Sequence, residues 1–172
     1  ADSSLVEAVI SGFVEKKENA NSEYEPTLIV NHDGRTMEKA LKEELERSQD
    51  FYMSVAFVSQ GAIQTLKQHF LDFADNNNHD SGRIITSTFN YFNSPKAFKE
   101  LLKLQQDTGI QIQVWQPGQQ ATIPDEITEE TDIAASGATA DYPYHPKGYV
   151  FRHSAGNEPL YATYIGSSNL TI

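Results

Sequence analysis

Two short motifs near the end of the chain contain residue types that could carry out a reaction together. His145 and Lys147 are separated by one residue, and the run Gly166-Ser167-Ser168-Asn169 follows further along. A histidine can act as a nucleophile or as a general acid and base. Lys147 supplies a cation, and Asn169 and the backbone N–H groups after Gly166 can donate to an oxyanion. This set of groups suits an anionic phosphodiester and needs no metal ion.

The residues between the two motifs predict a β-hairpin. Tyr149–Phe151 and Tyr161–Ile165 are rich in aromatic and β-branched residues, as strands are. A loop with Gly156 and Asn157 separates them. In an antiparallel pair, the start of the first strand lies beside the end of the second. We therefore expect the side chains of both motifs to point into one pocket.

The order of these motifs resembles the signature of the phospholipase D superfamily, H-x-K-x4-D followed by G-S-x-N. The longer runs H-P-K-G-Y-V-F and Y-I-G-S-S-N-L-T are similar to the nuclease-like module at the N-terminus of certain bacterial superfamily-2 helicases. The similarity extends back to about Thr27. Arg152 stands where the signature has its aspartate. In several branches of the superfamily, the acid that orients the histidine follows the G-S-x-N run.

The resemblance implies a metal-independent phosphodiesterase, a nuclease module acting on DNA within a larger helicase-type protein, with no cofactor. His145 would attack phosphorus to form a phosphohistidine, and a second histidine would protonate the leaving oxygen. The other site residues would hold the phosphoryl oxygens or bind the substrate: Lys147, Asn169 and Ser167 for the oxygens, Gly166 and Ser168 for the substrate.

A second interpretation stays open, a catalytically degenerate module that binds nucleic-acid ends or a protein partner. Arg152 in place of the signature aspartate and the acidic composition favour it. A phospholipid substrate ranks third, because the sequence shows no membrane-binding surface. Activity in the presence of EDTA would separate the first two interpretations.

The chain has one copy of each motif, whereas the implied mechanism needs two histidines. His153 lies beyond the first strand of the hairpin and is expected well away from His145. The remaining histidines, His32, His69 and His79, belong to other segments. Single-motif members of the superfamily imply a homodimer, in which a two-fold axis brings both copies of the site to one cleft.

The elements that position the motifs alternate between strands and helices. Ser59 and the pair Ser94-Pro95 are expected to begin two helices, and Gly109 to end the second. A further helix is expected over 36–47, capped by Asp33, with a solvated charged face. The predicted strands are Thr27–Val30, Phe51–Val58, Arg83–Phe89 and Gln111–Trp115. This order predicts an α/β fold with a mixed, mainly parallel sheet flanked by helices, a phospholipase D-like half-domain.

Two segments stand apart from this alternation. Residues 1–26 predict a short helix and a polar linker before a phospholipase D-like domain at 27–172. Residues 117–143 form an acidic insertion rich in Gly, Pro, Ala and Thr. A loop of this length is uncommon inside a domain unless it is functional. It could be a lid, an acidic surface that blocks nucleic acid, or a tolerated insertion.

The composition limits which partners and which cellular location the protein can be expected to have. The net charge of −11 argues against broad, non-specific nucleic-acid binding, although five of the 24 acids gather in residues 125–132. The absence of cysteine fits a cytoplasmic protein. No apolar run approaches the ~20 residues that cross a bilayer. Because the chain starts without Met and stops just after a motif, we expect it to be part of a longer protein.

Overall fold

A computed structural model describes residues 29, 31, 34, 36–77, 81–88, 93–116, 119–122, 144–155 and 158–171. The chain divides into two units, Ala1–Ala40 and Leu41–Ile172. Several predicted features lie outside the described residues. They are the helix and linker of residues 1–26, the cap Asp33, most of the insertion 117–143, and the strand Thr27–Val30 apart from Ile29.

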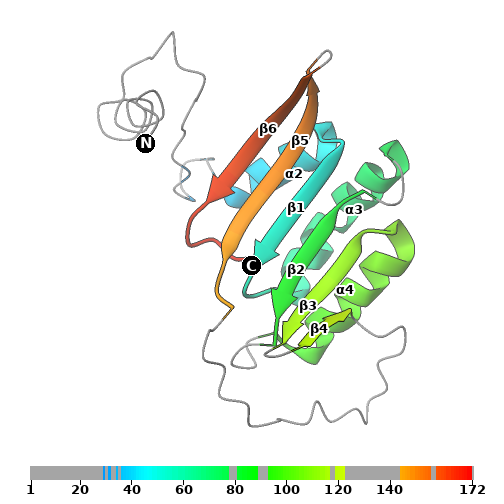
Figure 1. The fold of residues 1–172 in the computed structure, drawn as a ribbon, viewed down its shortest axis with the longest axis vertical. Helices are drawn as coiled ribbons and strands as arrows, with labels where there is room; N and C mark the ends of the chain where they lie inside the picture. The colour runs from blue at the N-terminus through cyan, green and yellow to red at the C-terminus, as the bar shows by residue number, and fades with distance from the viewer. Residues whose placement is uncertain are drawn as a thin grey trace. The chain divides into compact units, whose positions relative to one another are not determined.

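The described part contains a six-stranded sheet in the order β4-β3-β2-β1-β5-β6 (Figure 1). Two pairings, β1 with β2 and β2 with β3, are parallel. Three pairings, β1 with β5, β5 with β6 and β3 with β4, are antiparallel. The strands are β1 Asp50–Val55, β2 Arg83–Ser87, β3 Gln111–Gln116, β4 Gln119–Thr122, β5 Lys147–Ala155 and β6 Glu158–Ile165.

This arrangement confirms the α/β class and the mixed sheet. The expectation of a mainly parallel sheet is not met among the described strands, because antiparallel pairings outnumber parallel ones. The predicted hairpin joins the same sheet, beside β1, as expected. The difference comes from β4, which folds back on β3 within residues that were expected to be insertion, and from the predicted strand Thr27–Val30, of which only Ile29 is described.

Three helices accompany the sheet, α2 Met37–Arg47, α3 Gln60–Asn76 and α4 Pro95–Thr108. The predicted caps are confirmed. Ser59 Oγ accepts from the Ala62 N–H, and Ser94 Oγ accepts from the Ala97 N–H. Gly109 ends α4 in the left-handed conformation, with φ of 74°. At the start of α2, Thr36 Oγ1 accepts from the Lys39 N–H.

The helices cover one face of the sheet, and the core lies between them (Figure 1). Alternate residues of each central strand point into this layer and are buried. Phe51 of β1 lies at its centre, with ring centroids 5.8 Å from Phe70, 4.9 Å from Phe73 and 6.1 Å from Phe151. No helix of the described part covers the opposite face, which is called the open face below.

One glycine is required by this core. Gly82 has φ of 89°, and its N–H donates to Asp50 Oδ1 at 2.9 Å. A Cβ at this position would lie 2.7 Å from Cε1 of Phe51. The turn into β2 therefore passes against the central phenylalanine, at a distance that only glycine allows.

Several strands differ in extent from the prediction, and β1 and β5 differ in ways that bear on the two motifs. β1 ends at Val55, and Val58 forms an isolated bridge with Leu170 instead of continuing the strand. β5 runs on through Arg152 and His153 to Ala155, past the predicted end at Phe151. Among the described residues, no helix has the length and apolar character needed to cross a membrane.

Candidate active site

The two motifs meet at the carboxyl end of β1. The segment after β6 runs beside the segment after β1, because the Leu170 N–H donates to Phe57 O at 3.1 Å and the Ser59 N–H donates to Leu170 O at 2.9 Å. The start of β5 is fixed to the same place, since the Ala56 N–H donates to Pro146 O at 3.0 Å. Ligands of open α/β sheets bind outside the carboxyl ends of the parallel strands.

Phe57 is the residue around which the predicted site residues gather. Its ring centroid lies 5.3 Å from the His145 ring in an edge-to-face arrangement. The Lys147 ammonium lies 5.9 Å from the same centroid. The Phe57 N–H donates to Asn169 Oδ1 at 3.2 Å. The structure thus brings His145, Lys147 and Asn169 to one aromatic residue.

His145 and Lys147 are also in direct contact. Lys147 Nζ lies 2.7 Å from Nδ1 and 3.3 Å from Nε2 of His145, and it donates to the His145 carbonyl at 3.2 Å. An ammonium group can only donate hydrogen bonds, so the nearer ring nitrogen must offer its lone pair. While this contact lasts the lone pair is engaged, so attack by this nitrogen requires Lys147 to move from the ring onto a phosphoryl oxygen.

The Gly-Ser-Ser-Asn segment is held by the strand that follows His145. The Tyr149 hydroxyl donates to Ser168 O at 3.0 Å, and the Gly166 N–H donates to Lys147 O at 3.4 Å. The Tyr149 side chain is buried, and this burial raises the pKa of its hydroxyl. A buried neutral donor of this kind fixes the turn and limits how far Asn169 can move from Phe57.

Ser167 is not part of the group of residues around Phe57. It is exposed in the turn after β6, and the contacts within the described part link Asn169, not Ser167, to Phe57. Asn169 uses its carbonyl oxygen for the Phe57 N–H, and its NH2 group is not needed for this bond. That NH2 group can donate to a ligand at this edge.

Arg152 does not orient His145. It follows Lys147 by five residues on β5, a separation of roughly 17 Å along a strand. Its partners in the sheet are Asp50 and Tyr161, and its Nη1 donates to Gln49 Oε1 at 3.4 Å. Its side chain belongs to the open face of the sheet.

Two residues that shape the site were missed by the sequence analysis. Phe57 was assigned to the predicted strand Phe51–Val58, because it lies within an apolar run. Asn93 had no signal that separated it from other loop asparagines. It is buried, accepts from the Val58 N–H at 2.6 Å and donates to Ala56 O at 3.0 Å and to Ser87 O at 2.6 Å. Asn93 therefore fixes the segment that presents Phe57.

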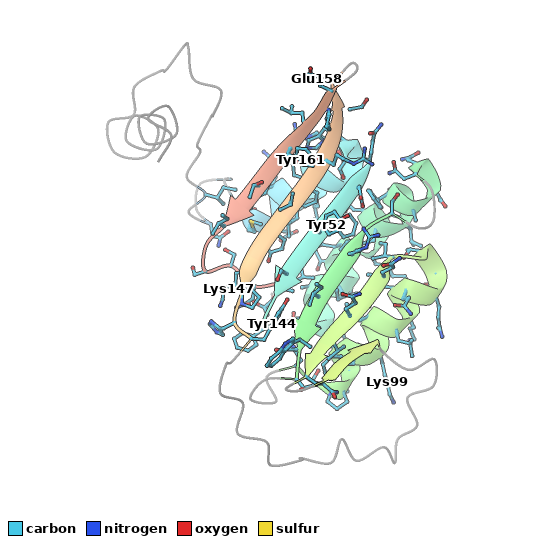
Figure 2. All side chains as sticks on the ribbon, viewed as in Figure 1. Tyr52, Lys99, Tyr144, Lys147, Glu158 and Tyr161 are labelled. Atoms are coloured by element: carbon cyan, nitrogen blue, oxygen red, sulfur yellow. The ribbon has the colours of Figure 1, made fainter. Side chains whose placement is uncertain are left out.

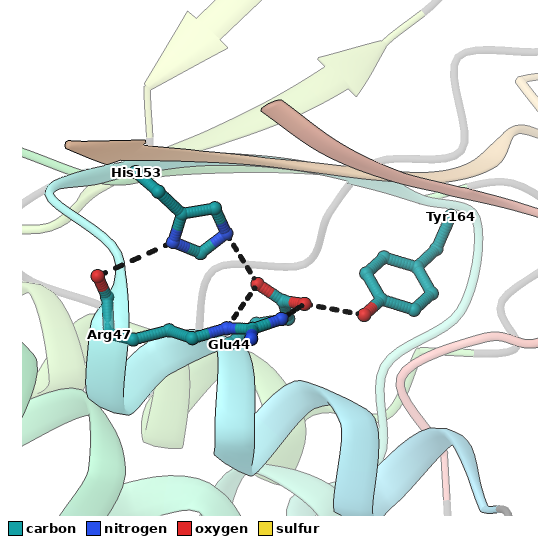
Figure 3. Close-up of polar contacts among 4 residues, drawn as sticks. All are labelled: Glu44, Arg47, His153 and Tyr164. Carbon is teal, nitrogen blue, oxygen red and sulfur yellow. Dashed lines mark hydrogen bonds and ion pairs between the residues drawn. The ribbon is translucent and has the colours of Figure 1, made fainter. Parts of the chain in front are cut away.

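A second polar cluster lies between α2 and the hairpin (Figure 3). Glu44 is buried and 1% exposed. One oxygen, Oε1, accepts from the Tyr164 hydroxyl at 2.6 Å and from Arg47, while Oε2 lies 2.7 Å from His153 Nε2. Nδ1 of His153 lies 3.3 Å from the Arg47 carbonyl oxygen. The polar groups of this cluster are thus arranged around one buried carboxylate.

The expectation of a solvated charged face on α2 is therefore wrong for Glu44. Burial acts to raise the pKa of Glu44, but hydrogen bonds from Arg47 and Tyr164 and the charges of Arg47 and His153 outweigh it and hold the pKa below its usual value. The position of His153 agrees with the expectation that it lies away from His145. It occupies the helix-facing side of β5, six residues beyond Lys147.

No protein-family model matches this chain, and no curated protein is similar enough to match it. Within the residues that the structure describes, no group of three or more His, Asp or Glu side chains is placed to hold a metal ion. The candidate site consists of a histidine and a lysine in contact beside an asparagine amide.

Proposed function

We propose that this chain is a metal-independent phosphodiesterase, a nuclease module with a phospholipase D-like half-domain. The observation that supports it is the meeting of His145, Lys147 and Asn169 at Phe57. These residues come from two motifs separated in the sequence, and the hairpin returns the second motif to the first. Their chemistry, a nucleophile, a cation and a neutral donor, fits a tetrahedral phosphate anion.

The proposed reaction has two displacements at phosphorus. A ring nitrogen of His145 attacks, the bond from phosphorus to the leaving oxygen breaks, and a second imidazolium gives its proton to that oxygen. The resulting imidazole then takes a proton from water, which attacks phosphorus and releases His145. Lys147 and the Asn169 NH2 group stabilise the charge on the phosphoryl oxygens.

The second imidazole is supplied by another copy of the chain. Of the described histidines, His153 is paired with Glu44 and His69 Nδ1 lies 3.4 Å from Glu46 on the helical layer. Neither is placed to protonate a leaving group beside His145. A two-fold dimer would bring the two copies of His145 together across one substrate.

Mixing experiments test the shared site. Wild-type protein is allowed to exchange subunits with an equal amount of His145→Ala, and the activity is compared with that of wild type alone at the same total protein concentration. A shared site leaves only wild-type homodimers active, so activity falls to about a quarter. Activity near one half, the value for independent chains, would exclude the shared site.

Nucleic acid, and DNA in particular, is the proposed substrate. Acidic and basic residues are equal in number among the described positions, so the net charge of −11 arises elsewhere in the chain. The described part of the chain is therefore not repelled by a polyanion as the total charge suggests. The helicase-type context and the cytoplasmic location rest on the resemblance and on composition alone.

A non-catalytic binding module is the second candidate. The position of Arg152 favours it, because no aspartate stands at that point and the arginine lies far along β5 from His145. In this case, the phosphate would be bound by Lys147 and Asn169 but not cleaved. Hydrolysis separates the two candidates.

The deciding experiment measures hydrolysis of bis(4-nitrophenyl) phosphate and of a labelled oligonucleotide in EDTA. Wild type is expected to cleave both, and His145→Ala to lose at least about a thousandfold in kcat. His69→Gln, a histidine change on α3, serves as the matched control and should retain full activity. Binding without cleavage by wild type would favour the second candidate. Loss of cleavage in EDTA with recovery in magnesium would refute the metal-independent mechanism.

A further inference from the structure

The open face of the sheet presents aromatic rings in the described part of the chain. Tyr52 and Tyr161 are 48% and 56% exposed, and both point away from the helices, as the strand register shows. Tyr144, Tyr52 and Tyr161 follow in that order along the strands, from the end near Lys147 toward the hairpin tip at Glu158 (Figure 2). Large aromatic side chains that are left exposed on a sheet mark a binding surface.

The rings at the site end of this face are already arranged for stacking. Tyr144 precedes His145 and stacks on Trp115, with ring centroids 5.6 Å apart and planes at 19°. Its hydroxyl forms a 2.8 Å hydrogen bond with Ser54 Oγ on β1. Trp115 belongs to β3, so Tyr144 spans β2 and holds a flat aromatic pair beside the candidate active site.

Arginines lie between the rings. The Arg83 guanidinium lies 5.1 Å from the Tyr52 ring centroid and donates to the Tyr52 hydroxyl at 2.7 Å. Arg152 pairs directly with Tyr161 across the β5–β6 ladder. Asp50 is the acidic residue that the described strands place on this face, and it accepts from the N–H groups of Phe51 and Gly82, which offset its charge.

We infer that the open face binds single-stranded nucleic acid, with bases stacked on the Trp115–Tyr144 pair and on Tyr52, and phosphates near Arg83 and Arg152. This inference rests on the proposed function, because the strand would continue into the site at His145. Alternating aromatic and cationic groups on a sheet are how single strands are bound without sequence preference. A duplex hides its base faces and would find nothing to stack on.

The test measures binding of fluorescein-labelled oligothymidylate, roughly twelve nucleotides long, by anisotropy. An abasic strand with the same phosphates is the second probe. Tyr52→Ala is expected to weaken oligothymidylate binding about tenfold, and Tyr52→Phe, which keeps the ring, by less than about twofold. Leu160→Ala is the matched control, because Leu160 is as exposed as Tyr161 but sits on the other face of β6.

Trp115 provides a second readout, since it is the single tryptophan of the chain. Oligothymidylate should quench its fluorescence, and the abasic strand should not. Equal binding of both strands, or unchanged affinity in Tyr52→Ala, would overturn the inference. The inference would also be overturned if Tyr52→Ala changed the sedimentation of the protein but not its binding of oligothymidylate. That result would show that the open face binds a second copy of the chain.

The two proposals can fail separately. If wild type binds oligothymidylate through Tyr52 but does not hydrolyse bis(4-nitrophenyl) phosphate, the open face stands and the proposed hydrolysis falls. If wild type hydrolyses this small substrate but Tyr52→Ala does not change the affinity for oligothymidylate, the proposed hydrolysis stands and the inference about the open face falls.

Discussion

Replacing Glu44 by glutamine should destabilise the fold, because it removes the charge around which the cluster in Figure 3 is built. The Tyr164 hydroxyl donates to this carboxylate at 2.6 Å, and His153 Nε2 lies 2.7 Å from it. A hydrogen bond to a charged group contributes about 1.5–3 kcal/mol and a neutral one about 0.5–1.5 kcal/mol. The Tyr164 hydrogen bond should therefore lose about 1 kcal/mol, and the ion-pair contact with His153 about as much again, because its partner loses the charge.

Arg47 adds little to this total. Its side chain is 63% exposed, and ion pairs of exposed groups contribute about 0–1 kcal/mol. The expected loss for Glu44→Gln is therefore about 2–3 kcal/mol. Urea denaturation at pH 7, followed by circular dichroism, measures it. Glu43→Gln makes the same chemical change at an exposed neighbour and should cost less than about 0.5 kcal/mol.

The loss should depend on pH in one direction. The pKa of Glu44 is lower in the folded state than the ordinary value of 4.5, so its contribution is fully present above that value. It disappears as the pH falls through the folded pKa. The difference between wild type and Glu44→Gln should therefore shrink below about pH 4.5. Equal stability of the Glu44 and Glu43 variants at pH 7, or a gap that persists in acid, would refute this reasoning.

Three further predictions address the core, the cluster and the site. Gly82→Ala should lower the free energy of unfolding by about 2–5 kcal/mol, because the backbone at this position is left-handed and the added Cβ would overlap with Phe51. Gly61→Ala within α3 is the control, and it should be neutral or stabilising in the same urea titration. The pKa of Tyr164 is raised by burial and by its hydrogen bond to Glu44, so the free energy of unfolding should fall as the pH rises above 10. The fall should be less steep in Tyr164→Phe. An equally steep fall with pH in both proteins would contradict the prediction. Phe57→Ala should lower kcat about 10- to 100-fold with little change in KM, because Phe57 positions His145 and Lys147; an effect confined to KM would contradict that role.

Local signals in the sequence were sufficient for the helix ends and the hairpin. Ser59, Ser94 and Gly109 act within one turn of their own position, so residue type and spacing are enough to predict them. The hairpin follows for the same reason, since both strands and the loop are contiguous. The two motifs then had to meet, because an antiparallel pair fixes which ends lie side by side.

The features that could not be predicted from the sequence depend on contacts between distant segments of the chain. β5 was predicted to stop at Phe151 because Arg152 and His153 are polar, yet their partners are Gln49 on the segment before β1 and Glu44 on α2. No periodicity within β5 contains that information. In the same way, Glu44 looks like its solvated neighbours in the sequence of α2 until the hairpin packs over it.

The candidate site shows the same division. His145, Lys147 and Asn169 were identifiable as residue types in ordered motifs. Phe57, which contacts all three, was not, because an aromatic residue at the end of an apolar run is typical of an ordinary strand. Its role follows only from the parallel bridge between Val58 and Leu170, which joins segments far apart in the chain.

The most direct test of the proposed reaction is a search for the covalent intermediate on His145. Wild-type protein is mixed with a labelled oligonucleotide in EDTA, quenched in alkali, in which phosphohistidine is stable, and analysed by mass spectrometry of its peptides. We expect a nucleotide fragment attached through phosphorus to His145, absent from His145→Ala and retained in His69→Gln. Cleavage that proceeds without such an adduct, or an adduct that survives in His145→Ala, would contradict it.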